Sequence, residues 1–245
     1  MCSSDLVANT QIRQVLAHAT DGRFQYNPTH YQALTPVVAQ CSKQSFRQAM
    51  TQEVLDRLAL TRSVPGLDLA RPEGAGLRDQ FDPRTWDRYQ SVLRDVAVPY
   101  RIDSKARSTR SEYPSYGLDA ASGLVSTAAD LARFEGELDR RSGTPLSFST
   151  LDQMWSNTTF AFTNGLTLTT PTGLGWFVTN ESGQRLVWTF GHIPDASSAL
   201  IVKMPSKRLT LIMLANSGGL AQGYNLENAN VTSSPFVKIF LRLFI

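Results

Sequence analysis

The apolar residues of this chain recur with two different periods, and the period changes near residue 170. Before that point they are spaced three or four positions apart, as on one face of an α-helix. After it come four β-rich runs: LGWFVTN, QRLVWTFG, SALIVKM and RLTLIMLAN. The first two runs are joined by NESG and the last two by PSKR, so we expect antiparallel hairpins. The pattern therefore requires a helical part followed by a sheet.

Several segments carry a helical pattern. QIRQVLAHA predicts a first helix, with Thr10 as its N-cap. Further helical patterns cover 31–38, 46–58 and 86–96. The stretch between them, residues 64–85, holds Pro and Gly residues at short intervals and is predicted to be an irregular connection.

Two later helices have recognisable starts. Ser126 or Thr127 is expected to cap a helix, and Thr127 with Asp130 has the spacing of a capping box. Its buried stripe is predicted to be Leu131, Phe134 and Leu138, with Gly143 just past its end. A further helix is expected to start at Ser149 or Thr150, and SPFVKIFLRLF predicts a helix at the C-terminus.

The order of elements predicts an α+β fold. We interpret residues 1–245 as part of a single domain, with about 1–170 mostly helical and about 171–245 forming antiparallel hairpins and a final helix. The strands are strongly apolar, which favours a sheet covered by helices on both faces.

Composition and motifs exclude several classes of function. A net charge of +3 gives no basic surplus for nucleic acid, and no apolar run is long enough to span a membrane. The start of the chain lacks the pattern of a signal peptide.

Cys2 and Cys41 fit no metal site, and whether they pair stays open. The three histidines are scattered and no nucleotide-binding glycine loop occurs, so neither metal nor cofactor is predicted. The histidines are His18, His30 and His192.

Four segments occur in an order that is characteristic of one family. They are TQIRQVLAHATDG, FQYNPTHYQAL, SGLVSTAADLARF and FGHIPDASSALIVKMPSKRLTLIMLANS. The chain resembles the β-lactamase-related serine hydrolases, which include class C β-lactamases, penicillin-binding-protein-like peptidases and esterases. The resemblance runs from Thr10 to the end of the chain. It implies a β-lactamase/transpeptidase-like fold.

The resemblance also implies acyl transfer through a serine acyl-enzyme. In that family a serine of an S-x-x-K motif attacks a carbonyl, and the lysine and a tyrosine handle its proton. Tyr26 falls on the tyrosine position, with Phe24 and Tyr31 on flanking aromatic positions. His192 falls at the start of the third motif, and the backbone N–H of Asp195 is the expected oxyanion donor.

The chain departs from the family pattern at three places. Pro28 replaces the asparagine that orients substrate, so that contact is expected to be lost unless Asn27 or another group supplies it. Pro194 replaces the glycine of the third motif and removes an N–H. No S-x-x-K occurs, because none of the five lysines has serine three positions before it. We therefore interpret the chain as the C-terminal portion of the domain, lacking its N-terminal part.

The leading hypothesis is a serine hydrolase that acts on a small ester, amide or peptide-like substrate, with this chain inactive by itself. The alternative is a binding module without catalytic activity that keeps the family cleft for a peptide or glycan. The family often works in the periplasm or outside the cell, which is the localisation that the resemblance implies. Without N-terminal strands, an apolar sheet edge would stay unpaired and promote self-association.

Overall fold

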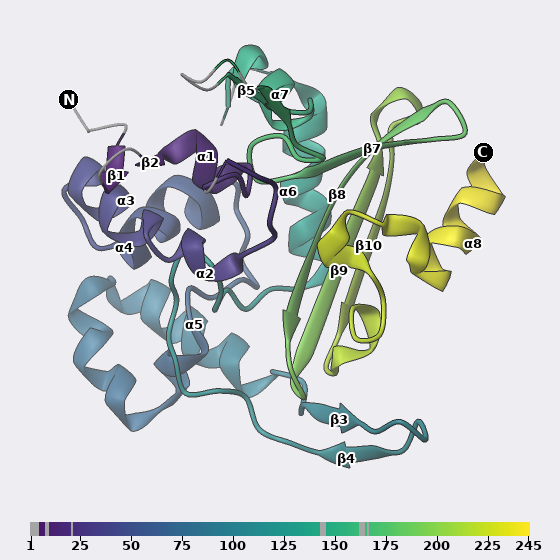
Figure 1. Ribbon diagram of the computed structural model, residues 1–245. Helices are drawn as coiled ribbons and strands as arrows, with labels where there is room; N and C mark the ends of the chain where they lie inside the picture. The colour runs from purple at the N-terminus through teal and green to yellow at the C-terminus, as the bar shows by residue number, and fades with distance from the viewer. Residues whose placement is uncertain (1–4, 8–9, 21, 143–145, 162–164, 166) are drawn as a thin grey trace.

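A four-stranded antiparallel sheet is the central element of the computed structural model (Figure 1). The structure describes residues 5–7, 10–20, 22–142, 146–161, 165 and 167–245. The strand order is β10-β9-β8-β7, with each strand antiparallel to its neighbour. The strands are β7 (Phe177–Glu181), β8 (Gln184–Ile193), β9 (Ser197–Met204) and β10 (Leu209–Ala215). All four predicted strands and the hairpins between them are confirmed.

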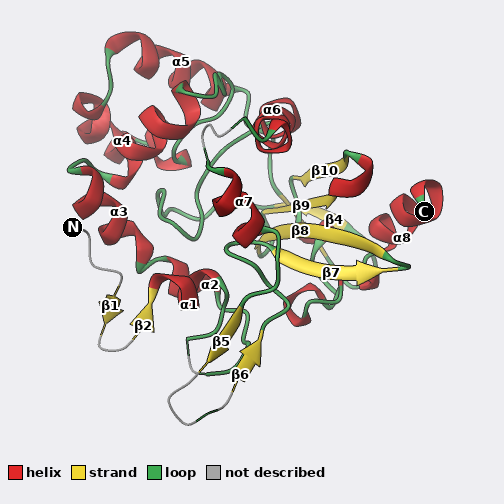
Figure 2. Cartoon of the chain, turned by 90° about the horizontal axis from the view of Figure 1, so that it is seen from above, coloured by secondary structure: helices red, strands yellow, loops and turns green. Residues whose placement is uncertain are grey.

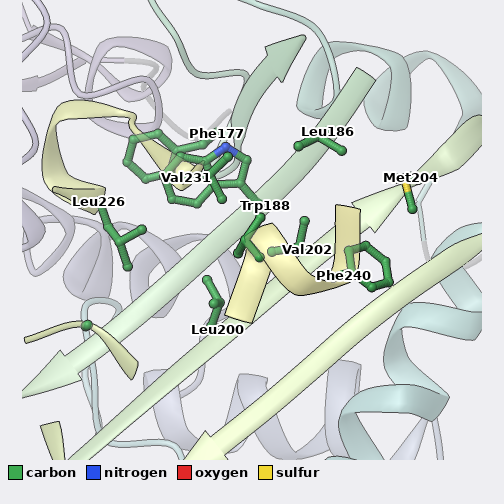
Figure 3. Close-up of a cluster of buried hydrophobic side chains, with 11 residues drawn as sticks. Phe177, Leu186, Trp188, Leu200, Val202, Met204, Leu226, Val231 and Phe240 are labelled. Carbon is green, nitrogen blue, oxygen red and sulfur yellow. The ribbon is translucent and has the colours of Figure 1, made fainter. Parts of the chain in front are cut away.

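One face of the sheet packs against the C-terminal helix α8 (Pro235–Phe244). Trp188 of β8 and Val202 of β9 are directly opposite each other in the sheet, so their side chains point to the same face. Phe240 of α8 is buried in the same cluster (Figure 3). Val237 of α8 is buried there too. This cluster fixes α8 on the sheet and confirms the predicted C-terminal helix.

The opposite face packs against helix α6 (Ala128–Arg140) and the segment after it. Val187 and Ile201, each one position from the residues of the first face, are buried there with Leu138 of α6 and Trp155. Figure 1 shows α6 in teal and α8 in yellow on the two sides of the sheet. The prediction of a sheet covered on both faces is therefore confirmed.

A buried ion cluster joins α6 to the sheet. Lys203 of β9 places its Nζ 2.7 Å from Oε2 of Glu135 and 2.7 Å from Oδ1 of Asp139. The Lys203 and Glu135 side chains are only 1% and 2% exposed. The ammonium also lies 4.7 Å from the centre of the Trp155 ring, within reach of a cation–π interaction. Burial raises the pKa of Glu135, and the neighbouring Lys203 opposes that rise.

The helical part forms a separate layer with its own apolar cluster, which includes Leu55, Leu69 and Tyr89 (Figure 2). The irregular connection predicted for 64–85 contains two 3₁₀ segments, η2 (Leu67–Ala70) and η3 (Pro72–Gln80). The other helices are α1 (Ile12–Leu16), α2 (Pro28–Tyr31), α3 (Leu34–Ser42), α4 (Phe46–Met50), the π-helical η1 (Thr51–Asp56), α5 (Pro83–Arg94) and α7 (Phe148–Met154).

The helix caps correct three of the sequence expectations. Thr127 caps α6 as predicted, but the carboxylate of Asp130 accepts hydrogen bonds from Arg62 N–H and the Ser63 hydroxyl instead of closing a capping box. The N-cap of α7 is Ser147, and not Ser149 or Thr150. The Ser147 hydroxyl accepts a hydrogen bond from the Thr150 N–H, three positions later. The other correction concerns α1, whose N-cap is Gln11 and not Thr10. Gly143 lies outside the described residues.

Three small hairpins were not predicted, because strands of two or three residues are too short to show a period of two. They are β1 (Asp5–Val7) with β2 (Thr10–Gln11), β3 (Tyr100–Ile102) with β4 (Ser108–Arg110), and β5 (Thr159–Ala161) with β6 (Thr167–Thr169). Short 3₁₀ segments also follow β9: η4 (Pro205–Lys207), η5 (Gly218–Leu220), η6 (Leu226–Asn228) and η7 (Val231–Ser233).

Candidate active site

The C-terminal end of α1 gathers the segments that form the site. The last carbonyls of a helix have no partner inside it and must be satisfied elsewhere. Here the Leu16 carbonyl accepts hydrogen bonds from the Tyr31 hydroxyl at 2.7 Å and the Gly175 N–H at 3.0 Å. The Ala17 carbonyl accepts one from the Thr172 hydroxyl at 2.8 Å. These bonds join the tyrosine segment to the chain that leads into β7.

His18 directly follows this helix end and contacts both neighbours of Tyr26. Its backbone is left-handed, with φ of 52°, a conformation that histidine adopts more readily than most residues. Its carbonyl accepts a hydrogen bond from Gln25 N–H at 2.9 Å, and its Nδ1 accepts one from Asn27 N–H at 3.2 Å. Burial, and secondly the charge of His30, lower the pKa of His18 to about 4. The imidazole is therefore neutral near pH 7, with its proton on Nε2.

Tyr26 lies between the first helices and the sheet. Its ring stacks on Phe190 of β8 with a centroid distance of 4.9 Å and lies 4.8 Å from the His18 ring. Within the part of the chain that the structure describes, the Tyr26 hydroxyl has no hydrogen-bond partner, whereas the Tyr31 hydroxyl binds a carbonyl. Burial, and secondly the charge of Glu227, raise the pKa of Tyr26 to about 12. Tyr26 is thus a protonated phenol with an uncommitted hydroxyl.

Two cavities adjoin Tyr26. The first has a volume of about 180 Å³ and an aromatic wall. Its lining is His18, Tyr26, Pro28, Tyr31, Ala120, Ala121, Thr172, Gly175, Trp176, Phe177, Thr189 and Phe190. The second has a volume of about 260 Å³ and a more polar lining formed by Phe24, Gln25, Tyr26, Glu227 and Asn228. Tyr26 forms part of the wall of both, so a molecule in either cavity would contact it.

The other predicted site residues lie outside the first cavity. Asn27 uses its side-chain oxygen to cap α2, accepting a hydrogen bond from Thr29 N–H at 3.1 Å. His192 is an exposed residue of β8, two positions beyond Phe190 and therefore on the same face. Asp195 lies in the turn between β8 and β9 with φ of 60°, and its carbonyl accepts a hydrogen bond from the Ser111 hydroxyl. Substrate contacts by these three residues remain predictions.

Several residues around Tyr26 were not predicted as part of the site. They are Thr172, Gly175, Phe190 and Glu227, together with the loop that carries Ala120 and Ala121. Each belongs to a segment far from Tyr26 in sequence, so only tertiary contacts reveal them. His18 lies at a helix end and forms its hydrogen bonds locally, with Gln25 and Asn27.

Among the residues described, no group of three or more His, Cys, Asp or Glu side chains is arranged to hold a metal ion. Across the same residues, no helix combines the length and apolar character required to cross a bilayer.

Comparison with known proteins shows which family and which solved structures this chain is similar to. The sequence model of the Beta-lactamase family matches residues 6–234. The octameric penicillin-binding protein homologue from Pyrococcus abyssi is 21% identical with a TM-score of 0.61, over 93% of this chain and 50% of that one. A D-stereospecific amidohydrolase from Streptomyces sp. is 17% identical with a TM-score of 0.60, over 85% of this chain and 68% of that one. A β-lactamase from Mycobacterium bovis is 18% identical with a TM-score of 0.51, over 85% and 66% respectively. No match was found among curated protein sequences.

The α+β architecture with its covered antiparallel sheet is that of the β-lactamase/transpeptidase-like proteins, a class of serine hydrolases and amidases. The chain belongs to the β-lactamase family. It spans about half the length of the Pyrococcus abyssi protein and of a penicillin-binding protein from Bacillus halodurans.

The buried neutral His18 predicts a pH-dependent stability. Its pKa in the folded chain is about 4, below the ordinary 6.5, so between these values the unfolded chain binds the proton first. Its contribution to stability is fully present above pH 6.5 and is lost as the pH falls towards 4, by about 3 kcal/mol. Chemical denaturation of the parent and of His18→Gln at several pH values would measure the difference. His192→Gln, at an exposed histidine, is the control for the effect of replacing a histidine with glutamine. If the free energy of unfolding changed with pH to the same extent in the parent and in His18→Gln, the prediction would be contradicted.

Proposed function

We propose that this chain forms the tyrosine side of the active site of a serine hydrolase that transfers an acyl group from a small ester or amide. The observation that supports this most directly is the Tyr26 hydroxyl. It has no hydrogen-bond partner within the described residues, although the ring is packed on Phe190 and His18. A tyrosine kept only for packing would be expected to satisfy its hydroxyl, as Tyr31 does.

The chemistry assigned to Tyr26 is proton transfer. With a pKa of about 12, Tyr26 is protonated near pH 7 and can donate its proton to a leaving group. To accept a proton it needs a nearby positive charge, which would lower that pKa. A lysine in an S-x-x-K motif would supply such a charge, and a serine in it would supply the nucleophile. The 245 residues contain no such motif.

The chain by itself should therefore not turn over substrate. A chromogenic short-chain ester and a chromogenic cephalosporin, offered to the purified chain, should be hydrolysed at the background rate. A fluorophosphonate probe should label none of its serines. Turnover above background that survives Tyr26→Phe would contradict the proposed mechanism, and labelling by the probe would reveal another nucleophile.

We also propose that the chain associates with itself through the edge of its sheet. Strand β10 pairs with β9 on one side, and across the described residues 209–215 no strand pairs with its other side. The strand is apolar, and Leu214 is 42% exposed. On the neighbouring helix α8, Ile239 and Leu243 are 56% and 69% exposed. An exposed apolar edge of this kind is a template for pairing with another strand.

The expected result is a sedimentation coefficient that rises with protein concentration. Leu214→Lys should shift the protein towards monomer, because a charge on an edge strand disfavours pairing between edges. The control is Tyr116→Lys, which replaces another exposed apolar residue (48% exposed) outside the sheet. A monodisperse monomer for the parent at every concentration would rule out the edge as an association site.

A further inference from the structure

We propose that His18 is the positioning residue of Tyr26: it holds the backbone on both sides of the tyrosine and thereby sets the direction of the hydroxyl. This inference rests on the proposed function, in which Tyr26 transfers the proton. His18 itself touches no reacting atom in this scheme and acts only through Tyr26.

The two hydrogen bonds of His18 carry the argument. Its main-chain carbonyl binds the N–H of Gln25, and its imidazole Nδ1 binds the N–H of Asn27. The residue before Tyr26 and the residue after it are thus fixed by a single histidine. Because Tyr26 lies between two anchored peptide groups, the backbone at its Cα has little freedom to turn. The ring of His18 also lies 4.8 Å from the ring of Tyr26, at an interplanar angle of 50°.

The backbone of His18 makes this double contact feasible. Left-handed geometry, with φ of 52°, directs the carbonyl and the side chain of one residue towards the same neighbouring segment. Among residues other than glycine, histidine, asparagine and aspartate tolerate this region best. Asparagine also has a side-chain oxygen that can accept a hydrogen bond. His18→Asn is therefore the conservative replacement.

The support for His18 is itself fixed. The carbonyls of the two preceding residues, Leu16 and Ala17, are bound by Tyr31, Gly175 and Thr172. His18 is 8% exposed, and its ring also faces Tyr31 at a centroid distance of 5.0 Å. Because His18 is itself held in place, its two hydrogen bonds can fix the backbone on either side of Tyr26. A histidine that only filled space would not need an acceptor atom facing Asn27.

The test is the titration of the Tyr26 phenol in the chain as it stands. The ultraviolet difference between each protein and its Tyr26→Phe partner isolates this tyrosine from the other six. The parent should titrate near pH 12, as expected for its buried phenol. His18→Phe keeps a ring but removes the acceptor, and should shift the Tyr26 midpoint about one unit or more towards the ordinary value of about 10. His18→Asn should restore the parent midpoint.

Two outcomes of this titration would overturn the inference. One is an unchanged Tyr26 midpoint in His18→Phe that is folded by circular dichroism. The other is a shift in His18→Asn as large as that in His18→Phe, which would mean that the acceptor is irrelevant.

A measurement on the parent covers the case in which His18→Phe does not fold. Protonated Nδ1 cannot accept a hydrogen bond, so the amide nitrogen resonance of Asn27 should shift with a midpoint near pH 4. An Asn27 resonance that does not titrate in the folded chain would overturn the inference. None of these readouts involves turnover, so failure of the proposed function would appear separately, in the ester assay.

Discussion

Replacing Lys203 with methionine is expected to lower the free energy of unfolding by about 3–5 kcal/mol. The lysine is buried between Glu135 and Asp139, and it is the only cation within salt-bridge distance of Glu135 among the described residues. Methionine has a similar volume, so little of the loss comes from packing. Most of it comes from leaving Glu135 buried and charged without a partner, and Oε1 of this carboxylate already lacks a hydrogen bond among those residues.

Chemical denaturation of Lys203→Met at pH 7 measures this loss. The matched control is Lys105→Met, at an exposed lysine, which should change stability by no more than about 0.5 kcal/mol. The double variant Lys203→Met with Glu135→Gln should regain part of the loss, because the uncompensated charge is gone. The loss in free energy of unfolding that Lys203→Met alone causes should also become smaller towards acid pH, since its unpaired Glu135 can take up a proton. A deficit that is the same at pH 5 and pH 8 would show that packing, and not the buried charge, is responsible.

Replacing Tyr26 with phenylalanine should reduce catalysis by about 10²- to 10⁴-fold in a fusion that supplies a serine nucleophile. Such a fusion places an N-terminal segment with an S-x-x-K helix before Met1, and its rate is read with the same chromogenic ester. The variant removes only an oxygen atom that makes no hydrogen bond within the described residues. Stability should therefore change little while the rate falls.

Tyr31→Phe provides the matched control for this experiment. It removes the same atom from a tyrosine of the same cavity, but one whose hydroxyl binds the Leu16 carbonyl. We expect it to lower stability by about 1 kcal/mol and to leave most of the rate. If Tyr31→Phe lowered the rate as much as Tyr26→Phe, the two hydroxyls would have the same role and the assignment of Tyr26 would be wrong.

The sheet and its covering helices could be predicted because their signals lie within single segments. β8 and β9 are long, apolar and separated by turn residues, and α6 and α8 carry apolar residues at helical spacing. The caps of α1 and α7 were placed on the wrong residues because several polar side chains compete at each start. At α7 the Ser147 hydroxyl accepts a hydrogen bond from the Thr150 N–H, and at α1 the Gln11 N–H donates one to the Gln14 side chain. The sequence does not show which of these bonds form.

The site was only partly predictable for a different reason. The ordered motifs predicted Tyr26 as a site residue, with Phe24 and Tyr31 on the flanking aromatic positions. Its remaining surroundings come from segments that approach in space alone, such as Phe190 and Glu227. The side chain of Asn27 caps α2, because Pro28 starts that helix and favours a capping residue before it, and its contact with substrate stays a prediction.

The bond between the Thr172 hydroxyl and the Ala17 carbonyl joins residues that are 155 positions apart. Contacts of such long range close a large loop and tend to form slowly. During synthesis, the last carbonyls of α1 can form these hydrogen bonds only after residues 172–175 have left the ribosome. The wall around Tyr26 should therefore be among the last parts of the molecule to become ordered, well after the local helices have formed.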